Sequence, residues 1–153
     1  MDPFVQVILD LFAEAYEGPG GPYSWFTDHG PESGLFGSLE GLSAARASMP
    51  AVPGGTTIAA HAEHLRWSLA LANEYARGGQ PKPSWKESWS VREVDQPAWV
   101  RLQADLRQEY DTLRQALAAQ RDWHDPQFLT GVVALVPHAA YHLGAIRQMM
   151  LHT

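Results

Sequence analysis

The sequence predicts an all-α protein, and more closely a four-helix bundle with long crossover connections. Apolar residues recur at three- and four-residue steps in four long segments, which is typical of helices with one buried face. No alternation of apolar and polar residues lasts long enough to predict a sheet. The chain has 153 residues, of which 45% are hydrophobic. This length and composition favour a single domain, residues 1–153, with a sizeable core.

The first two predicted helices have clear starts and ends. Asp2 and Pro3 supply an N-cap and a first-turn residue for the first helix, and the glycines and prolines of residues 18–22 end it. Its apolar stripe consists of Phe4, Val5, Ile8, Leu11, Phe12 and Ala15. The second helix is predicted from about Thr56 to Ala76. Its apolar face consists of Ile58, Ala62, Leu65, Leu69 and Ala72.

The last two predicted helices differ in polarity. The third begins near Asp95 and has one apolar face and one charged face, so its charged face is expected in solvent. Its apolar face consists of Trp99, Leu102, Leu106, Leu113 and Leu117. The fourth begins near Asp125 and runs toward the C-terminus. It is almost entirely apolar until Arg147, so we expect it to be the most buried of the four.

The connectors favour a bundle that is not a simple up-down-up-down design. Long segments follow the first and second helices, and a shorter one follows the third. In the first connector, four apolar residues predict one short extra helix: Leu35, Phe36, Leu39 and Leu42. The second connector, residues 80–94, contains Trp85 and Trp89 and is expected to cross the surface.

Composition excludes several functional classes. The net charge is −6 and no cluster of lysines and arginines occurs, so we expect no nucleic-acid partner. The chain has no cysteine, which excludes disulfides, thiolate zinc sites and cysteine nucleophiles. The N-terminus is acidic and does not resemble a signal peptide. The longest apolar stretch, "FLTGVVALVPHAAYHLGAI", is interrupted by Pro137 and two histidines. We therefore expect a soluble, cytoplasmic protein with no membrane partner.

Two histidines four residues apart, His138 and His142, are the first candidate metal ligands. Residues at this spacing share one face of a helix, so both imidazoles can reach one ion. The small residues Ala139, Ala140 and Gly144 leave room for an ion beside them. Pro137 predicts a kink or a freed carbonyl just before the pair. The alternative is a pair of core histidines that are hydrogen-bonded to the backbone.

A third ligand can come from "AAHAEHL" in the second helix, which contains His61 and His64. With Ile58 and Leu65 at the centre of the buried face and about 100° per residue, His61 lies roughly 60° and His64 roughly 120° off centre. This pattern predicts that His61 is the more buried of the two. Either histidine can be the ligand on this reasoning. The segment is not the metalloprotease pattern HExxH, because its histidines are three residues apart.

Most of the chain resembles the DinB/YfiT-like superfamily, four-helix bundles that hold a metal with three histidines. "PGGTTIAAHAEHL" is similar to the family's turn, its threonine and the helix whose ligand precedes a leucine or isoleucine. "HAAYHLGAI" is similar to the family's HxxxH on the last helix. The resemblance implies the ligands His64, His138 and His142, with Zn²⁺ or Ni²⁺ as the cofactor. Many relatives have Gln or His where this chain has Ala145.

The resemblance implies a metal-dependent enzyme, since three protein ligands leave coordination positions open. The family includes hydrolases and enzymes that transfer low-molecular-weight thiols to electrophiles. Because no carboxylate stands out as a general base, thiol S-transfer to a small-molecule substrate is slightly preferred. No catalytic residue is assigned. The alternative is a non-catalytic, stress-associated or binding bundle whose metal site is vestigial or empty.

Weaker expectations concern the other histidines and self-association. His29 is a minor candidate for the site, His124 is expected to be exposed, and His152 is expected to be frayed. A homodimer is a further option. Its interface would use apolar residues of the first connector, such as Trp25, Phe26, Leu35 and Phe36.

Overall fold

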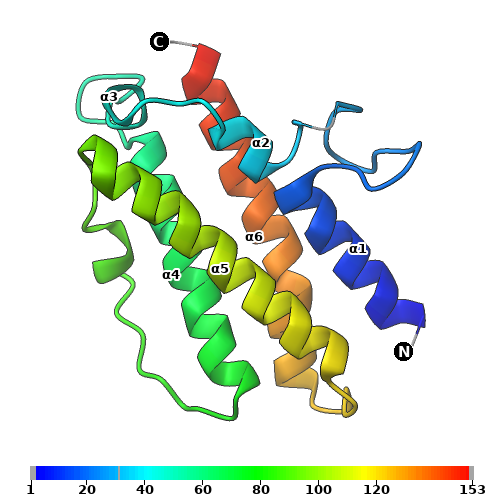
Figure 1. The fold of residues 1–153 in the computed structure, drawn as a ribbon. Coiled ribbons are helices and arrows are strands. Elements are labelled where there is room, and N and C mark those ends of the chain that lie inside the picture. Colours follow the sequence, from blue (N-terminus) through cyan, green and yellow to red (C-terminus); the bar gives the residue numbers. More distant parts are fainter. Residues whose placement is uncertain (1–2, 31, 152–153) are drawn as a thin grey trace. The chain divides into compact units, whose positions relative to one another are not determined.

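The computed structural model describes residues 3–30 and 32–151, and within these ranges the chain is helical with no strand. Figure 1 shows the helices in chain order. The elements are α1 (Pro3–Glu17), α2 (Leu35–Leu39), α3 (Ala44–Ala47), α4 (Ile58–Ala76), the 3-10 helix η1 (Glu87–Trp89), α5 (Gln96–Ala119) and α6 (Pro126–Leu151). The all-α prediction is confirmed. The predicted N-cap Asp2 and the terminal His152 lie outside the described residues.

The four predicted long helices correspond to α1, α4, α5 and α6. Side chains before three of them accept hydrogen bonds from the first turn, as N-caps do. Thr57 Oγ1 accepts from the Ala60 N–H at 3.1 Å. The Asp95 carboxylate accepts from the Ala98 N–H at 2.8 Å, and the Asp125 carboxylate accepts from the Gln127 N–H at 2.9 Å. The capping residues therefore explain why the sequence located these starts correctly.

The short elements were predicted less completely. The extra helix α2 ends at Leu39, before Leu42, and the four-residue α3 follows it. Ser43 begins α3 by accepting a hydrogen bond from the Arg46 N–H at 3.2 Å. Neither α3 nor η1 was predicted, because elements of three or four residues are too short to show an apolar period.

Residue contacts divide the chain into two compact units, Met1–Glu40 with Arg114–Gly144, and Gly41–Leu113 with Ala145–Thr153. In the first unit, α1 packs against α2. The Tyr16 ring lies 5.0 Å from that of Phe12 and 5.6 Å from that of Phe36, centroid to centroid. The predicted α1 stripe is buried at Val5, Ile8, Phe12 and Ala15. Phe4 is 59% exposed, so its place on that stripe was wrong. It lies in the first turn, about 100° around the helix from Val5.

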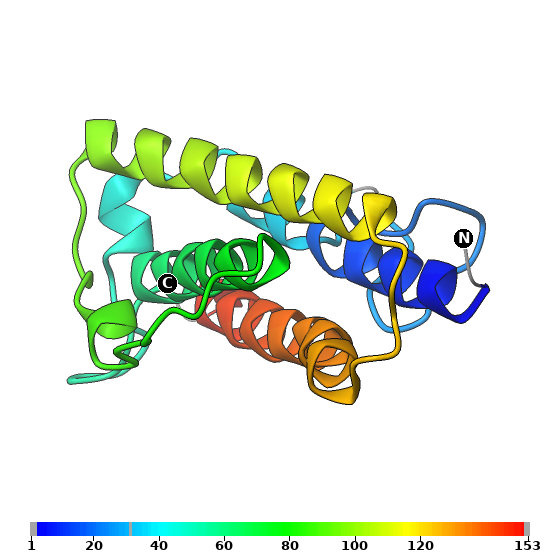
Figure 2. The same ribbon diagram turned by 90° about the horizontal axis from the view of Figure 1, so that it is seen from below.

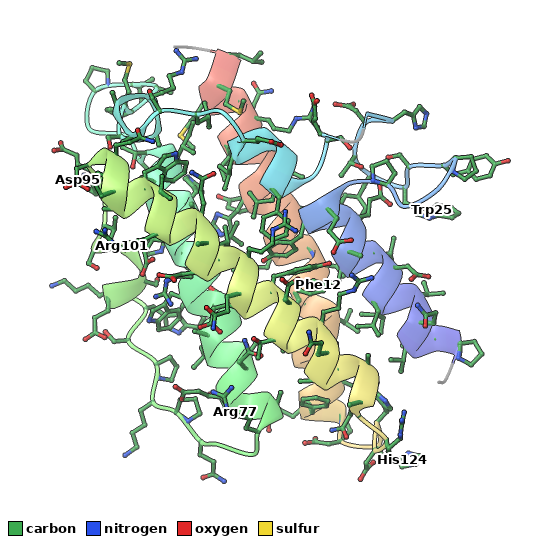
Figure 3. All side chains as sticks on the ribbon, viewed as in Figure 1. Phe12, Trp25, Arg77, Asp95, Arg101 and His124 are labelled. Carbon is green, nitrogen blue, oxygen red and sulfur yellow. The ribbon has the colours of Figure 1, made fainter. Side chains whose placement is uncertain are left out.

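A buried carboxylate fixes the connector that follows α1. Glu14 is 4% exposed, and its Oε1 accepts hydrogen bonds from three backbone N–H groups, those of Trp25, Phe26 and Thr27, at 2.8–3.1 Å. The hydroxyls of Ser24 and Thr27 also donate to it, each at 2.9 Å. Burial alone raises the pKa of Glu14, but the hydrogen bonds outweigh burial and lower the pKa below its ordinary value. Trp25, labelled in Figure 3, remains 77% exposed on this fixed segment.

In the second unit, hydrogen bonds join α4 and α5 to their connectors and to each other. The Thr57 hydroxyl donates to the Arg92 carbonyl at 2.7 Å, and the buried Trp99 donates through Nε1 to the Leu42 carbonyl at 2.8 Å. The Asn73 amide donates to the Glu109 carbonyl at 2.9 Å. The connector of residues 80–94 stays at the surface as expected, with Trp85 57% exposed. Its short helix η1 nevertheless packs against α4, as Figure 2 shows.

The expectation that the fourth helix is the most buried was wrong. The buried residues of α6 form one stripe, which consists of Val132, Ala139, His142, Leu143, Ile146 and Met149. Elsewhere on the helix, Val133 is 40% exposed, Tyr141 71% and Leu151 74%. An apolar sequence without periodicity does not indicate how much of a helix is covered.

The apolar character of α6 also bears on the membrane expectation. Among the described residues, this one helix is long and apolar enough to cross a membrane by length and composition alone. Core helices of soluble proteins meet the same two criteria. The interruptions at Pro137, His138 and His142 thus do not lower its mean hydropathy below that of a spanning helix.

Candidate metal centre

His138 and His142 lie next to each other on α6, within the first unit. Their Nε2 atoms are 3.1 Å apart, and the two rings meet at 84° with centroids 4.6 Å apart. Imidazole nitrogens bound to one zinc ion lie about 2.0–2.1 Å from the metal, and hence roughly 3 Å from each other. The pair therefore lies at hydrogen-bonding distance, and the same separation suits two imidazoles bound to one ion. His142 is 3% exposed, and the Tyr141 ring packs edge-on against it at 5.0 Å.

The surroundings of His138 favour a neutral imidazole. Burial lowers the pKa of His138 below its ordinary value, because a charged ring would lose hydration. A metal binds only the neutral form, so burial removes competition from protons. Pro137 lies inside α6, which is one continuous helix from Pro126 to Leu151. Of the small residues near the pair, Ala139 is buried and Gly144 is exposed.

His64 lies on α4 in the second unit and is held on two sides by η1 and its connector. Its Nδ1 is 2.8 Å from the Ser88 hydroxyl oxygen. Its ring stacks on the Trp89 indole at a centroid distance of 4.3 Å and an interplanar angle of 18°. The Trp85 ring lies 6.3 Å away. The plane of the imidazole is therefore fixed, and its Nδ1 has a hydrogen-bond partner.

The predicted difference in burial between His61 and His64 is not observed. Both residues are 5% exposed. The helical wheel placed His64 at a flank of α4, but η1 covers that flank with Ser88 and Trp89. His61 meets Trp89 edge-on at 5.3 Å and 90°. Burial lowers the pKa of His61 to about 4.

The two other described histidines named in the sequence analysis lie on the surface. His29 and His124 are both exposed, and Figure 3 shows His124 on the connector between α5 and α6. The prediction for His124 is confirmed. The sequence reasoning missed Ser88, which contacts a candidate ligand directly. A lone serine in "KESWSV" gives no periodic signal, and only the position of the tryptophans beside it hinted at packing.

The described residues are helical, and a close histidine pair lies on α6. These two features place the protein among helical proteins with a candidate metal centre. The model of the DinB superfamily matches residues 33–146, more than half of the chain. The protein therefore belongs to the DinB superfamily, and the predicted resemblance is confirmed. Comparison with curated proteins gave no match, nor did comparison with solved structures. All three predicted ligands lie in the matched region. Their imidazoles are a donor set compatible with metal binding.

Proposed function

We propose that the protein is a metal-dependent enzyme in which His64, His138 and His142 bind one divalent ion, Zn²⁺ or Ni²⁺. The observation that supports this best is the His138–His142 pair, whose Nε2 atoms are 3.1 Å apart in a chain of the DinB superfamily. His64 is assigned as the third ligand because it precedes Leu65 and follows Thr57 at the family's spacing. Thr57 is also the N-cap of α4, so it fixes where the helix and its histidines begin.

Three neutral imidazoles suit catalysis better than structure. They hold the ion without neutralising its charge, and three protein ligands leave positions open for substrate. A divalent ion bound there supplies Lewis acidity that lowers the pKa of a thiol or of water. The protein's own contribution is to keep His138 neutral by burial and to hold the His64 ring against Trp89.

Within this class we propose thiol S-transfer in preference to hydrolysis. The carboxylate nearest to His64 in the sequence, Glu63, forms a two-point ion pair with Arg66, with both N–O distances 2.8 Å. A carboxylate held in this way is poorly placed to take a proton from water. In S-transfer, the sulfur of a low-molecular-weight thiol forms a bond to an electrophilic carbon while the bond from that carbon to its leaving group breaks. The leaving group takes the bonding electron pair, and the proton of the broken S–H bond passes to it. The proposed partners are thus a small-molecule electrophile and such a thiol.

The proposal also includes a cytoplasmic location, no nucleic-acid or membrane partner, and a homodimer. The net charge of −6 supports the absence of nucleic-acid binding. For the dimer, Trp25 and Phe26 are 77% and 40% exposed and suit an interface. Leu35 is 1% exposed, so the expectation that it contributes to an interface was wrong. Its side chain faces the interior because α2 packs against α1.

The competing proposal is a non-catalytic, stress-associated or binding bundle with a vestigial or empty site. Metal analysis of protein purified without a nickel column separates the two. The enzyme proposal predicts about one equivalent of metal and a rise in melting temperature on adding Zn²⁺ or Ni²⁺. Less than about a tenth of an equivalent, with unchanged melting, would refute it.

Two alanine variants then test the ligand set. His64→Ala is expected to lose the metal, whereas His61→Ala retains it. The reverse result would assign His61 as the third ligand. A screen of thiols against a generic electrophile, with the metal-loaded protein, tests S-transfer: turnover that requires both thiol and metal supports it, and hydrolysis without a thiol contradicts it.

A further inference from the structure

We infer that Ser88 is a positioning residue of the proposed metal centre, which sets the His64 ring so that its Nε2 is the metal ligand. This inference rests on the proposed function, because it concerns how one of the three ligands is oriented. Ser88 lies in η1, outside the histidine segments, and is fully buried at 0% exposed. Its role follows from the hydrogen bonds of a single hydroxyl group.

The direction of these hydrogen bonds is fixed by their chemistry. The Ser88 Oγ lies 2.8 Å from the Trp85 carbonyl oxygen and 2.8 Å from His64 Nδ1. A carbonyl oxygen can only accept, so the one hydroxyl proton of Ser88 is donated to Trp85. The hydroxyl oxygen must then accept from His64. The neutral His64 side chain is therefore in the tautomeric form that has its proton on Nδ1.

This tautomer determines which nitrogen can bind a metal. In a neutral imidazole with Nδ1 protonated, Nε2 has the lone pair. Histidine ligands in metal sites usually donate their other N–H to a protein acceptor, which fixes both tautomer and ring orientation. Ser88 is placed to be that acceptor for His64. His138 and His142 face each other through the same type of atom, Nε2.

Neighbouring residues of η1 fix the remaining freedom of the ring. Trp89 stacks on the imidazole at an interplanar angle of 18°, so the ring plane is set by the residue next to Ser88. The helix η1 packs against α4, so that Ser88 and Trp89 both contact His64. The hydrogen bond to Ser88 and the stacking on Trp89 both restrict the orientation of the imidazole. A ligand orientation that exists before the ion arrives raises metal affinity, because less ordering is required on binding.

The tautomer can be measured directly in metal-free protein. Long-range ¹H–¹⁵N correlation spectra distinguish the two neutral forms of His64. We expect the form protonated on Nδ1 in the wild type and loss of this preference in Ser88→Ala. A wild-type His64 protonated on Nε2 would overturn the inference. This readout needs no metal and no activity.

Zinc affinity tests the consequence of the tautomer. Ser88→Ala is expected to weaken Zn²⁺ binding about 10- to 100-fold, the usual effect of removing the partner of a histidine ligand. Ser88→Thr keeps the hydroxyl and should restore much of the affinity. The matched control is Ser90→Ala, on the exposed residue that follows η1, which should bind Zn²⁺ as the wild type does. Equal affinity in wild type and Ser88→Ala would refute the role of Ser88.

The two measurements also separate this inference from the proposed function. If the wild type binds no Zn²⁺, the proposed function is wrong and Ser88 has no metal to serve, whatever the tautomer. If the wild type binds Zn²⁺ and Ser88→Ala binds it equally well, only the role of Ser88 is wrong. A merely structural serine would lower the melting temperature of the variant without changing the tautomer of His64 or its zinc affinity.

Discussion

Buried His61 should make the stability of the metal-free protein depend on pH. Its pKa is about 4 in the folded protein because burial penalises the charged ring. In the unfolded chain a histidine titrates near its ordinary pKa of about 6.5. Between these values the unfolded chain binds a proton that the folded protein does not, so protons favour unfolding. The stability that neutral His61 contributes is therefore fully present above about pH 6.5 and is lost progressively as the pH falls toward about 4.

The size of this effect follows from the gap between the two pKa values. At about 1.4 kcal/mol for each pH unit, the gap corresponds to about 3 kcal/mol of unfolding free energy. This is a large part of the unfolding free energy of a domain, which is typically about 5–15 kcal/mol. His61 is 5% exposed, so solvent screens its charged form only weakly.

Urea unfolding of metal-free protein at several pH values, between about 7.5 and 4, measures the effect. The informative variant is His61→Phe, which keeps an aromatic ring against Trp89 and removes the ionisable group. Its unfolding free energy should fall by about 3 kcal/mol less than that of the wild type over this range. Parallel curves for the two proteins would refute the reasoning. So would an NMR titration of His61 with a midpoint near its ordinary pKa.

Three further predictions concern other parts of the chain. Glu14→Gln should lower the unfolding free energy by about 1–3 kcal/mol at neutral pH. Because the pKa of Glu14 is lowered in the folded protein, the wild type should lose this extra stability as the pH falls below the ordinary Glu range. Urea unfolding in which the free energies of wild type and variant do not converge at low pH would contradict this. Thr57→Ala should cost about 1 kcal/mol of stability, while Thr57→Ser, which keeps the capping oxygen, should cost much less; equal losses in the two variants would exclude capping as the cause. Trp25→Glu should convert the proposed homodimer to a monomer in light scattering without changing its helical content, since Trp25 is 77% exposed; an unchanged mass would place any interface elsewhere.

The helices were predictable from the sequence because their signals are local. The starts of α4, α5 and α6 depend on capping residues at Thr57, Asp95 and Asp125, each within three residues of the N–H that it accepts from. The exposure of α6 was not predictable in the same way. It depends on which parts of the chain cover each face of the helix. An apolar sequence does not distinguish a helix that is buried on one face from a helix that is buried on all faces.

The candidate site shows the same division between local and distant signals. The His138–His142 pair follows from a four-residue spacing on one helix, which places the two side chains on the same helix face. The burial of His64 and its hydrogen bond depend on Ser88, 24 residues further along the chain. No periodic pattern in the connector predicts η1, so a helical wheel drawn on α4 alone placed His64 too far from the core.

A double-mutant cycle on His64 and Ser88 separates folding from function at this site. In metal-free protein, Ser88→Ala alone leaves the buried Nδ1–H of His64 without its acceptor, which should cost about 1–3 kcal/mol. Replacing both residues, as in His64→Leu with Ser88→Ala, removes the donor as well and should be nearly neutral or stabilising. The coupling between the two sites is then of order 0.5–3 kcal/mol. If the pair serves the metal, the double variant should fold as well as the metal-free wild type but gain no stability from Zn²⁺. A double variant that is much less stable than the wild type in the absence of metal would show that the pair is needed for folding, and would contradict a functional reason for its burial.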